Sequence, residues 1–464
     1  MKRLTPFVAV ATLALSAVPA FAQAPRETPP APGVPKDFVL PTLRSFSLPN
    51  GLEVTMAPYG LTPKVAIRLV VRTGNVDETA ETVWLADLTR DLMLEGTTTR
   101  TAQQIAEEAA RYGGPVGFSV GMNESGIGGD VLTEHGPAML RLIADVVRNP
   151  RFPESELARL KANRVRQVTV SKTRQQSLAN EKFLATLFPG HPYGRLFPTD
   201  AQLQGYTVDQ VRAFHAANYG ARRSHLYVVG RFDAAAMEAA IRQSFGDWQP
   251  GTAPAFNPPT PKTARAIHII DRPGAVQSTI YLGLPVVDPS HPDYVALRVT
   301  DAILGGSFGS RITSNIREQK GYTYSPFSTV NPFLKNAYWA EIADVTTNVT
   351  GPSLKEIFFE IDRLQAEPPT AAELESIKKY LAGIFVLQNS SRLGIIGQLQ
   401  FTELHGLGEN YLRELVRKIY AVTPADVQRI AREYLRDDTM TIVIAGDRRQ
   451  IEEQIKPFGN IVND

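Results

Sequence analysis

The sequence predicts an α+β fold built from two copies of one domain in tandem. Three pairs of segments resemble one another in the same order, and their offset stays close to 216 residues. The pairs are 154–164 with 371–381, 207–219 with 423–435, and 226–233 with 441–449. A constant offset over several elements indicates an internal repeat, whereas chance similarity would affect a single helix. We therefore predict one domain over 42–248 and its copy over 266–464, joined by a proline-rich linker at 249–265.

The N-terminal residues predict export. Residues 1–22 combine a basic start at Lys2 and Arg3, an apolar stretch and the tripeptide Ala20-Phe21-Ala22, which is the pattern of a cleavable signal peptide. The apolar run is too short to span a bilayer, so we expect no membrane anchor after cleavage. Residues 23–41 are rich in proline and polar residues and predict a flexible lead-in. The expected location is the periplasm.

The elements of the first domain follow from local patterns. Asn50-Gly51 separates two strand-like runs and predicts a hairpin. One long helix is expected to start after Pro153 and to run into the 180s. Further strands are expected at 64–74, 114–122, 125–133 and 224–232, and further helices at 82–95, 101–111, 136–147, 207–219 and 234–245.

Composition excludes several classes of protein. The chain has no cysteine, so it has neither disulfides nor a thiolate metal site. Loss of Lys2 and Arg3 with the signal peptide would leave 47 basic and 47 acidic residues. A neutral chain lacks the basic footprint of a nucleic-acid-binding protein.

The most informative stretch is 304–325. Gly305-Gly306 predicts a turn, an amphipathic helical segment ends near Lys320, and Gly321 suits the left-handed cap of that helix. Arg317 then lies in the last helical turn, and Tyr324 stands near the start of the next strand.

A guanidinium and a phenol brought together by that reversal could stabilise an oxyanion or clamp a peptide carbonyl. The alternative is a solvent-facing Arg317 and a packing Tyr324. Tyr322 would share the strand face of Tyr324 by the period of two, so it competes for the tyrosine role.

This stretch resembles the C-terminal domain of the pitrilysin/insulinase-type zinc metallopeptidases, which include the mitochondrial processing peptidase. The matching pattern is Gly305-Gly306, then Ser310-Arg311-Ile312, then Arg317 and Tyr324. In that family the arginine and tyrosine bind the substrate backbone and polarise the scissile carbonyl, so the resemblance makes Arg317 and Tyr324 the candidate catalytic residues.

The resemblance also bears on the glycine turn and on the fold. It implies substrate binding by Gly305, Gly306, Ser307 and Phe308, although a tight connection between helices is an equally good explanation of this turn. It extends over about 42–456 and implies that each domain is a mixed sheet with helices packed on it. Together the two domains would form half of a clamshell around an enclosed chamber.

The family's zinc motif is degenerate here. Active members carry His-x-x-Glu-His on the first helix, where two histidines bind zinc and the glutamate activates water. Asp87, Arg90 and Asp91 stand at those three positions. Arginine cannot act as a base and repels a divalent cation, so the simpler reading is that Arg90 offsets the two aspartates.

The remaining ligand positions agree. The region of the family's third ligand, near Arg166 and Gln167, belongs to a stretch from 161 to 180 without any acidic residue. The seven histidines include no pair at helical ligand spacing. We therefore expect no metal in this chain.

These observations predict a zinc-free subunit of a periplasmic heterodimeric metalloendopeptidase that acts on unfolded peptides. A homologous partner would bring the zinc, and this chain would not be active alone. The first rival hypothesis is a structural or peptide-binding scaffold subunit of a larger complex. The second is a self-sufficient peptidase with an unrecognised metal site, which the sequence supports poorly.

Overall fold

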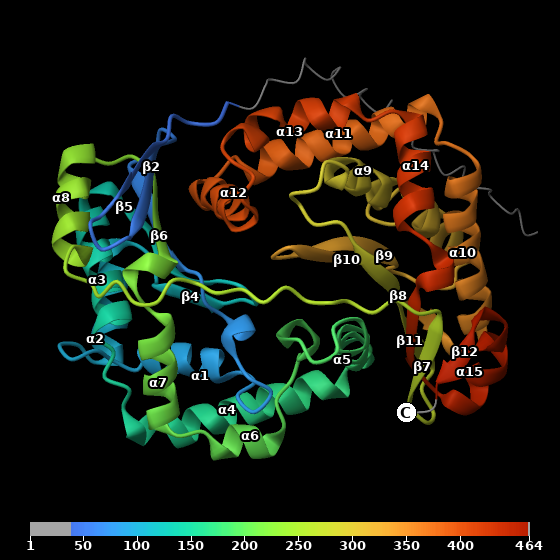
Figure 1. The fold of residues 1–464 in the computed structure, drawn as a ribbon, viewed down its shortest axis with the longest axis horizontal. Coiled ribbons are helices and arrows are strands. Elements are labelled where there is room, and N and C mark those ends of the chain that lie inside the picture. Colours follow the sequence, from blue (N-terminus) through green and yellow to red (C-terminus); the bar gives the residue numbers. More distant parts are fainter. Residues whose placement is uncertain (1–38, 463–464) are drawn as a thin grey trace, which may run out of the picture. The chain divides into compact units, whose positions relative to one another are not determined.

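The first domain is organised on a six-stranded mixed sheet. The structure is a computed structural model that describes residues 39–462, so the predicted signal peptide and most of the lead-in lie outside the described residues. The strand order is β1-β2-β6-β3-β5-β4, and β2, β4, β5 and β6 of this sheet are labelled in Figure 1. The strands are β1 Arg44–Ser47, β2 Glu53–Pro58, β3 Lys64–Val71, β4 Gly117–Val120, β5 Ser125–Leu132 and β6 Ser224–Gly230.

The second domain repeats five of the six strands of this sheet in the same order. Its order is β12-β7-β11-β8-β10-β9. The strands are β7 Ala266–Asp271, β8 Gln277–Val286, β9 Phe327–Phe333, β10 Asn336–Thr346, β11 Thr441–Gly446 and β12 Asn460–Val462. In each sheet one inner pair is parallel, β2 with β6 and β7 with β11, and the next three pairs are antiparallel. Only the first edge strand differs, because β1 is antiparallel to β2 and β12 is parallel to β7.

Helices pack on both sheets, which confirms the predicted fold class. The first domain contains α1 Leu85–Met93, α2 Ala102–Tyr112, α3 Gly136–Arg148, α4 Glu154–Thr173, α5 Gln175–Leu187, α6 Asp200–Gly205, α7 Val208–Asn218 and α8 Ala234–Phe245. The second contains α9 Tyr294–Leu304, α10 Thr350–Ala366, α11 Ala371–Gln388, α12 Arg392–His405, α13 Asn410–Ala421, α14 Pro424–Tyr434 and α15 Arg448–Ile455. No helix within 39–462 combines the length and apolarity needed to cross a bilayer.

Equivalent helices begin at equivalent caps. The Thr207 side chain accepts a hydrogen bond from the backbone N–H of Gln210 at the start of α7, and the Gln210 side chain accepts one from the backbone N–H of Thr207. Thr423 and Asp426 form the same reciprocal capping box at the start of α14. Each box satisfies two backbone donors that a helix end leaves free. The repeated sequence therefore sets the same helix boundary twice.

The two domains exchange a helix. Residues 39–462 belong to one unit by their contacts, and within it α5 of the first domain packs on β7, β8 and β11 of the second sheet. In return, α12 of the second domain packs on β3 and β6 of the first.

The central strands show why this exchange is needed, since all residues of β11 are buried. Ile442 and Ile444 join the core of their own domain, whereas Val443 and Ala445 pack in a cluster with Phe183 of α5. Successive side chains of a strand point to opposite faces. The second face of each sheet is thus covered by the other domain's helix.

The predicted long helix after Pro153 is in fact two helices. Arg174 has ψ of 125°, an extended conformation that ends α4 and precedes α5. The break redirects the chain so that Phe183 and Leu187, both without solvent exposure, reach the second sheet. Neither proline nor glycine lies there, so local sequence did not reveal the break.

Phe183→Ala tests the exchanged helix. The ring lies 5.6 Å from that of Tyr281 and 5.7 Å from that of Tyr338, centroid to centroid. We expect the free energy of unfolding to fall by about 3–5 kcal/mol, as for other fully buried phenylalanines, with both sheets still melting in one transition. Urea denaturation followed by circular dichroism measures this. Phe359→Ala, at a half-exposed ring, is the control, and an equal effect of both changes would contradict the packing role.

Candidate functional site

A cavity of about 340 Å³ in the second domain gathers the residues that the sequence singled out. Its lining residues come from the turn after α9, the helical turn 313–319, the segment 324–327 that leads into β9, and α11. They are Gly305, Gly306, Ser307, Phe308, Thr313, Arg317, Tyr324, Ser325, Pro326, Phe327 and Tyr380. All six residues predicted for catalysis or substrate binding therefore line one site.

Arg317 is carried by a widened helical turn. Residues 313–319 are π-helical, and the N–H of Lys320 donates to the carbonyl of Asn315 at 3.0 Å. Gly321 then adopts φ of +65°, the left-handed conformation expected for the cap. Short π-helical turns often occur at functional sites because they re-aim a side chain. Here the turn places Arg317 on the cavity side.

The guanidinium of Arg317 lies against two aromatic rings. Its central carbon is 4.4 Å from the ring centroid of Phe308 and 4.8 Å from that of Tyr324. Its Nε also lies 3.2 Å from a carboxylate oxygen of Glu318. Cation–π contacts orient the guanidinium without using its hydrogen-bond donors, so donors remain for an acceptor in the cavity.

Tyr324 is the tyrosine that faces the site. It is 79% exposed, and no described residue hydrogen-bonds its hydroxyl group. Tyr322 instead packs against the core of the second domain. The expectation that both share a strand face is wrong, because β9 begins only at Phe327 and residues 322–324 form no more than an isolated bridge, between Thr323 and Val345. The strand period of two therefore does not apply to them.

Two buried carboxyl groups lie directly beneath the glycine turn. A side chain at Gly305 would place its Cβ 2.6 Å from Oε2 of Glu341, and one at Gly306 would come 2.6 Å from Oδ2 of Asp301. Asp301 accepts hydrogen bonds from the Ser328 hydroxyl at 2.5 Å and from the Trp339 indole at 2.9 Å. Glycine is therefore required sterically at both positions, and the buried carboxyl groups support the turn from below.

Of the two carboxyl groups, Glu341 is the one that lacks hydrogen-bond partners. It has no solvent exposure, and neither oxygen has a partner among the described residues. Burial and the nearby Asp301 raise its pKa well above the usual value for glutamate. Burial beneath the turn therefore favours the neutral form of this carboxyl over the ionised one.

Glu341→Gln should remove a loss of folding stability that grows as the pH rises. Below about pH 4 the carboxyl is protonated in both folded and unfolded chains, so it adds no pH dependence; above that, only the unfolded chain ionises readily, which favours unfolding. The variant's free energy of unfolding should rise relative to wild type by at least about 1 kcal/mol between pH 4 and pH 8. Urea titrations at both pH values test this. Glu367→Gln, at an exposed position, should show no such trend, and a flat difference for Glu341→Gln would contradict the assignment.

The two aspartates at the degenerate zinc positions bind an arginine from another helix. Asp87 and Asp91 lie on α1, and Arg164 of α4 reaches between them. Its Nε donates to Asp91 Oδ2 at 2.7 Å, and its Nη1 donates to Asp87 Oδ1 at 3.2 Å and to the Gln167 side chain at 3.1 Å. The side chain of Arg164 is only 6% exposed. A guanidinium thus supplies the positive charge that the two carboxylates require.

These residues do not fit zinc. The inner oxygens of both aspartates are engaged by a permanently charged side chain, and Arg90 lies 3.3 Å from the other oxygen of Asp91. Across residues 39–462, no group of three or more histidine, aspartate or glutamate side chains could hold a metal ion. Sequence reasoning assigned the compensating charge to Arg90. The main partner is instead Arg164. Its position three residues before Gln167, near the region of the family's third zinc ligand, was the signal that could have identified it.

Arg164→Gln should destabilise the first domain. Two partly buried carboxylates would lose their cation, and breaking such a buried pair costs about 3–5 kcal/mol. Arg166→Gln, two residues away and exposed, is the matched control. Adding Asp87→Asn and Asp91→Asn to Arg164→Gln should recover part of the loss in urea denaturation. Equal effects of the two arginine changes would refute the bridging role.

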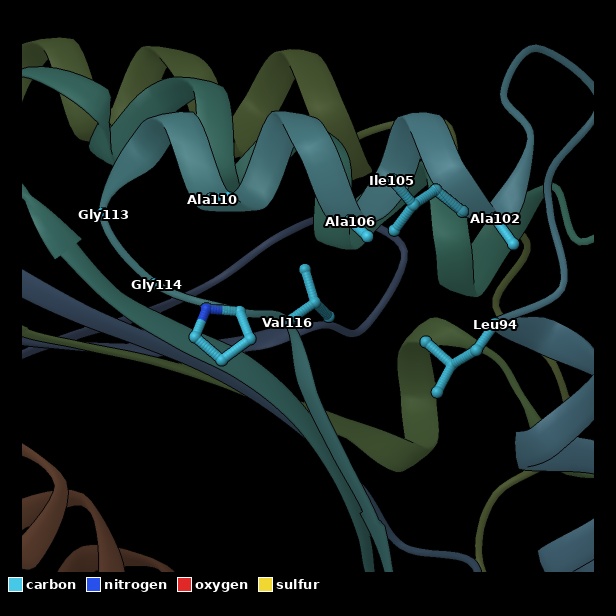
Figure 2. Close-up of a pocket in the computed structure, with 9 residues that line it drawn as sticks. Leu94, Ala102, Ile105, Ala106, Ala110, Gly113, Gly114 and Val116 are labelled. Carbon is cyan, nitrogen blue, oxygen red and sulfur yellow. The ribbon is translucent and has the colours of Figure 1, made fainter.

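A different cavity in the first domain offers no chemistry. It has a volume of about 550 Å³ and lies beneath α2, as Figure 2 shows for Ile105, Ala106 and the facing Val116. Its lining consists only of aliphatic residues, proline and glycine. Without a polar side chain it cannot orient a reacting group.

The fold and the two sites define a class of protein: a tandem αβ peptidase-type chain in which Arg317 and Tyr324 line a cavity and an arginine pairs with the two aspartates at the degenerate zinc positions. The chain belongs to peptidase family M16, the insulinase family. A profile described as insulinase (peptidase family M16) matches residues 57–198, and one described as the peptidase M16 inactive domain matches residues 205–381.

Individual relatives agree with this assignment. An uncharacterized zinc protease of Mycobacterium bovis is 25% identical over 431 residues, which cover 89% of this chain and 96% of the relative. The crystal structure of a peptidase M16 inactive domain from Pseudomonas fluorescens superposes with a TM-score of 0.81 at 26% identity, covering 87% and 98% of the two chains. A protease from Helicobacter pylori, at 20% identity, shares the fold with a TM-score of 0.81 over 88% and 100% of the chains.

Proposed function

We propose that this chain is the zinc-free subunit of a heterodimeric metalloendopeptidase of the periplasm. A homologous partner would carry the zinc and the general base, and this subunit would supply Arg317 and Tyr324. The observation that carries the proposal is the contrast between its two sites. Arg317 and Tyr324 line an accessible cavity, whereas Arg164 fills the space between Asp87 and Asp91.

Arg317 would hold the substrate backbone. A guanidinium can donate two parallel hydrogen bonds to one acceptor group, and the rings of Phe308 and Tyr324 keep its plane fixed. The turn at Gly305 and Gly306 lines the same cavity as Arg317 and Tyr324, so it would offer its backbone to an extended peptide bound there.

Tyr324 would donate its hydroxyl proton in a hydrogen bond to the oxyanion that develops at the scissile carbonyl. Its exposure of 79% fits a group completed by a surface outside this chain. Phe308 is 72% exposed beside it, and burial of both rings against a substrate and a partner would be favourable. The predicted signal peptide at 1–22 supports export.

Arg317→Ala and Tyr324→Phe should each lower kcat without preventing assembly. The partner for this test is a chain from the same genome that carries His-x-x-Glu-His. Loss of one oxyanion donor costs about 10²–10³ in turnover, so Tyr324→Phe should fall in that range on an unstructured fluorogenic peptide. Tyr322→Phe, which removes a hydroxyl from the neighbouring tyrosine, is the control.

Two outcomes would contradict the proposal. Wild-type rates from Arg317→Ala and Tyr324→Phe in an intact complex would favour the scaffold hypothesis. Stoichiometric zinc binding and peptide cleavage by the purified chain alone would show that it needs no partner. Size-exclusion chromatography of each mixture establishes that assembly has occurred.

A further inference from the structure

A further cavity of the second domain lies among four helices, and polar side chains line part of it. Its volume is about 520 Å³, and its walls come from α9, α11, α12 and α13. Most of its lining is aliphatic or aromatic: Val295, Leu381, Ile384, Phe385, Phe401, Tyr411, Leu415 and Ile419. This volume lies within the range of small-ligand sites in proteins.

Arg298 is the only charged residue among those that line this cavity. Arg298 is an exposed residue, and no salt bridge joins it to another side chain within residues 39–462. Asp301, one turn further along α9, is within electrostatic range, but its carboxyl is already bonded to Ser328 and Trp339. The cavity therefore presents an available cation on an apolar wall.

Tyr294 adds a second donor on the same helix face. It lies four residues before Arg298 on α9, so the two side chains are neighbours. Tyr294 is only 3% exposed, and the Arg298 guanidinium lies close enough to its hydroxyl oxygen to interact with it. The hydroxyl proton itself has no acceptor within the described chain, so a ligand oxygen placed here would accept a hydrogen bond that is otherwise not made.

A guanidinium beside a phenol suits a carboxylate, which accepts bidentate bonds from the first and a further bond from the second. The aliphatic and aromatic walls suit an apolar group attached next to that carboxylate. Phosphate or sulfate would satisfy the donors but would leave the apolar walls empty.

We propose that this cavity binds the C-terminal carboxylate of a peptide whose last side chain is large and apolar. It lies beside the Arg317 cavity, because Tyr380 of α11 lines that one and Ile384, one turn on, lines this one. Along α9, Arg298 precedes Gly305 by two turns, or about 10 Å. An extended peptide spans that gap with about three residues. The assignment of this peptide as substrate rests on the proposed function.

The anchor can be tested on the isolated full chain by calorimetric titration. The probes are an acetylated pentapeptide ending in Leu-Phe as free acid, the same peptide as C-terminal amide, and a free acid ending in glycine. We expect the Phe-terminated acid to bind at least about tenfold more tightly than the other two. Arg298→Gln should abolish the preference for acid over amide, and Tyr294→Phe should weaken it severalfold.

The control variant is Arg417→Gln, at a 73% exposed arginine on α13. It should bind like wild type, and thermal melting confirms that each variant is folded. Equal affinity for acid and amide would overturn the proposal. Decanoate is the competing source of the same chemistry, and saturable decanoate binding with no measurable peptide binding would also overturn it.

The result separates this inference from the proposed function. Binding is measured without a partner and without turnover, and Arg317→Ala should leave it unchanged. If the free acid shows no advantage while Arg317→Ala still lowers turnover in the complex, only the anchor is wrong. If the anchor holds but turnover ignores Arg317 and Tyr324, only the proposed function fails.

Discussion

The reciprocal covering of the two sheets is the constraint on which the rest of this structure depends. Strands β6 and β11 are buried on both faces, and in each case the second face is covered by a helix from the other domain. Tyr227 and Val229 of β6 pack with Ile395 of α12, as Val443 and Ala445 of β11 pack with α5. Exposed apolar sheet faces are unfavourable in water. Neither domain therefore has a complete core alone, and the relative placement of the sites follows from this exchange.

A polar contact reinforces the same junction. Arg392, at the start of α12, donates two hydrogen bonds of 2.9 Å to the carboxylate of Asp130 on β5. Arg392 holds the pKa of Asp130 below its usual range by bonding the ionised form. Bidentate geometry fixes orientation as well as distance, so the exchanged helix meets the first sheet in one register.

Much of this architecture was accessible from sequence because its causes are local. Repeat offset, capping threonines and the glycine at 321 each report a conformation of their own segment. What sequence missed was nonlocal. The break at Arg174 follows from the sheet that α5 must cover, and the pairing of Arg164 with Asp87 depends on how α1 meets α4. Glu341 lies beneath the glycine turn only because β10 passes there. The side-chain direction of Tyr322 was predicted wrongly because residues 322–324 lie outside a regular strand, where the period of two does not apply.

The same distinction applies to the two sites. The cavity-lining residues between 305 and 324 lie in one continuous segment, and Asp301 and Glu341 lie beneath its glycine turn. The metal positions lie on two helices distant in sequence, and their two carboxylates still need a cation if α1 and α4 are to remain packed. Arg164 supplies that charge without any requirement for a base or an open coordination position. The residues at the degenerate zinc positions are thus compatible with the fold through their pairing with Arg164, whereas a side chain at position 305 would collide with Glu341 and Ser328.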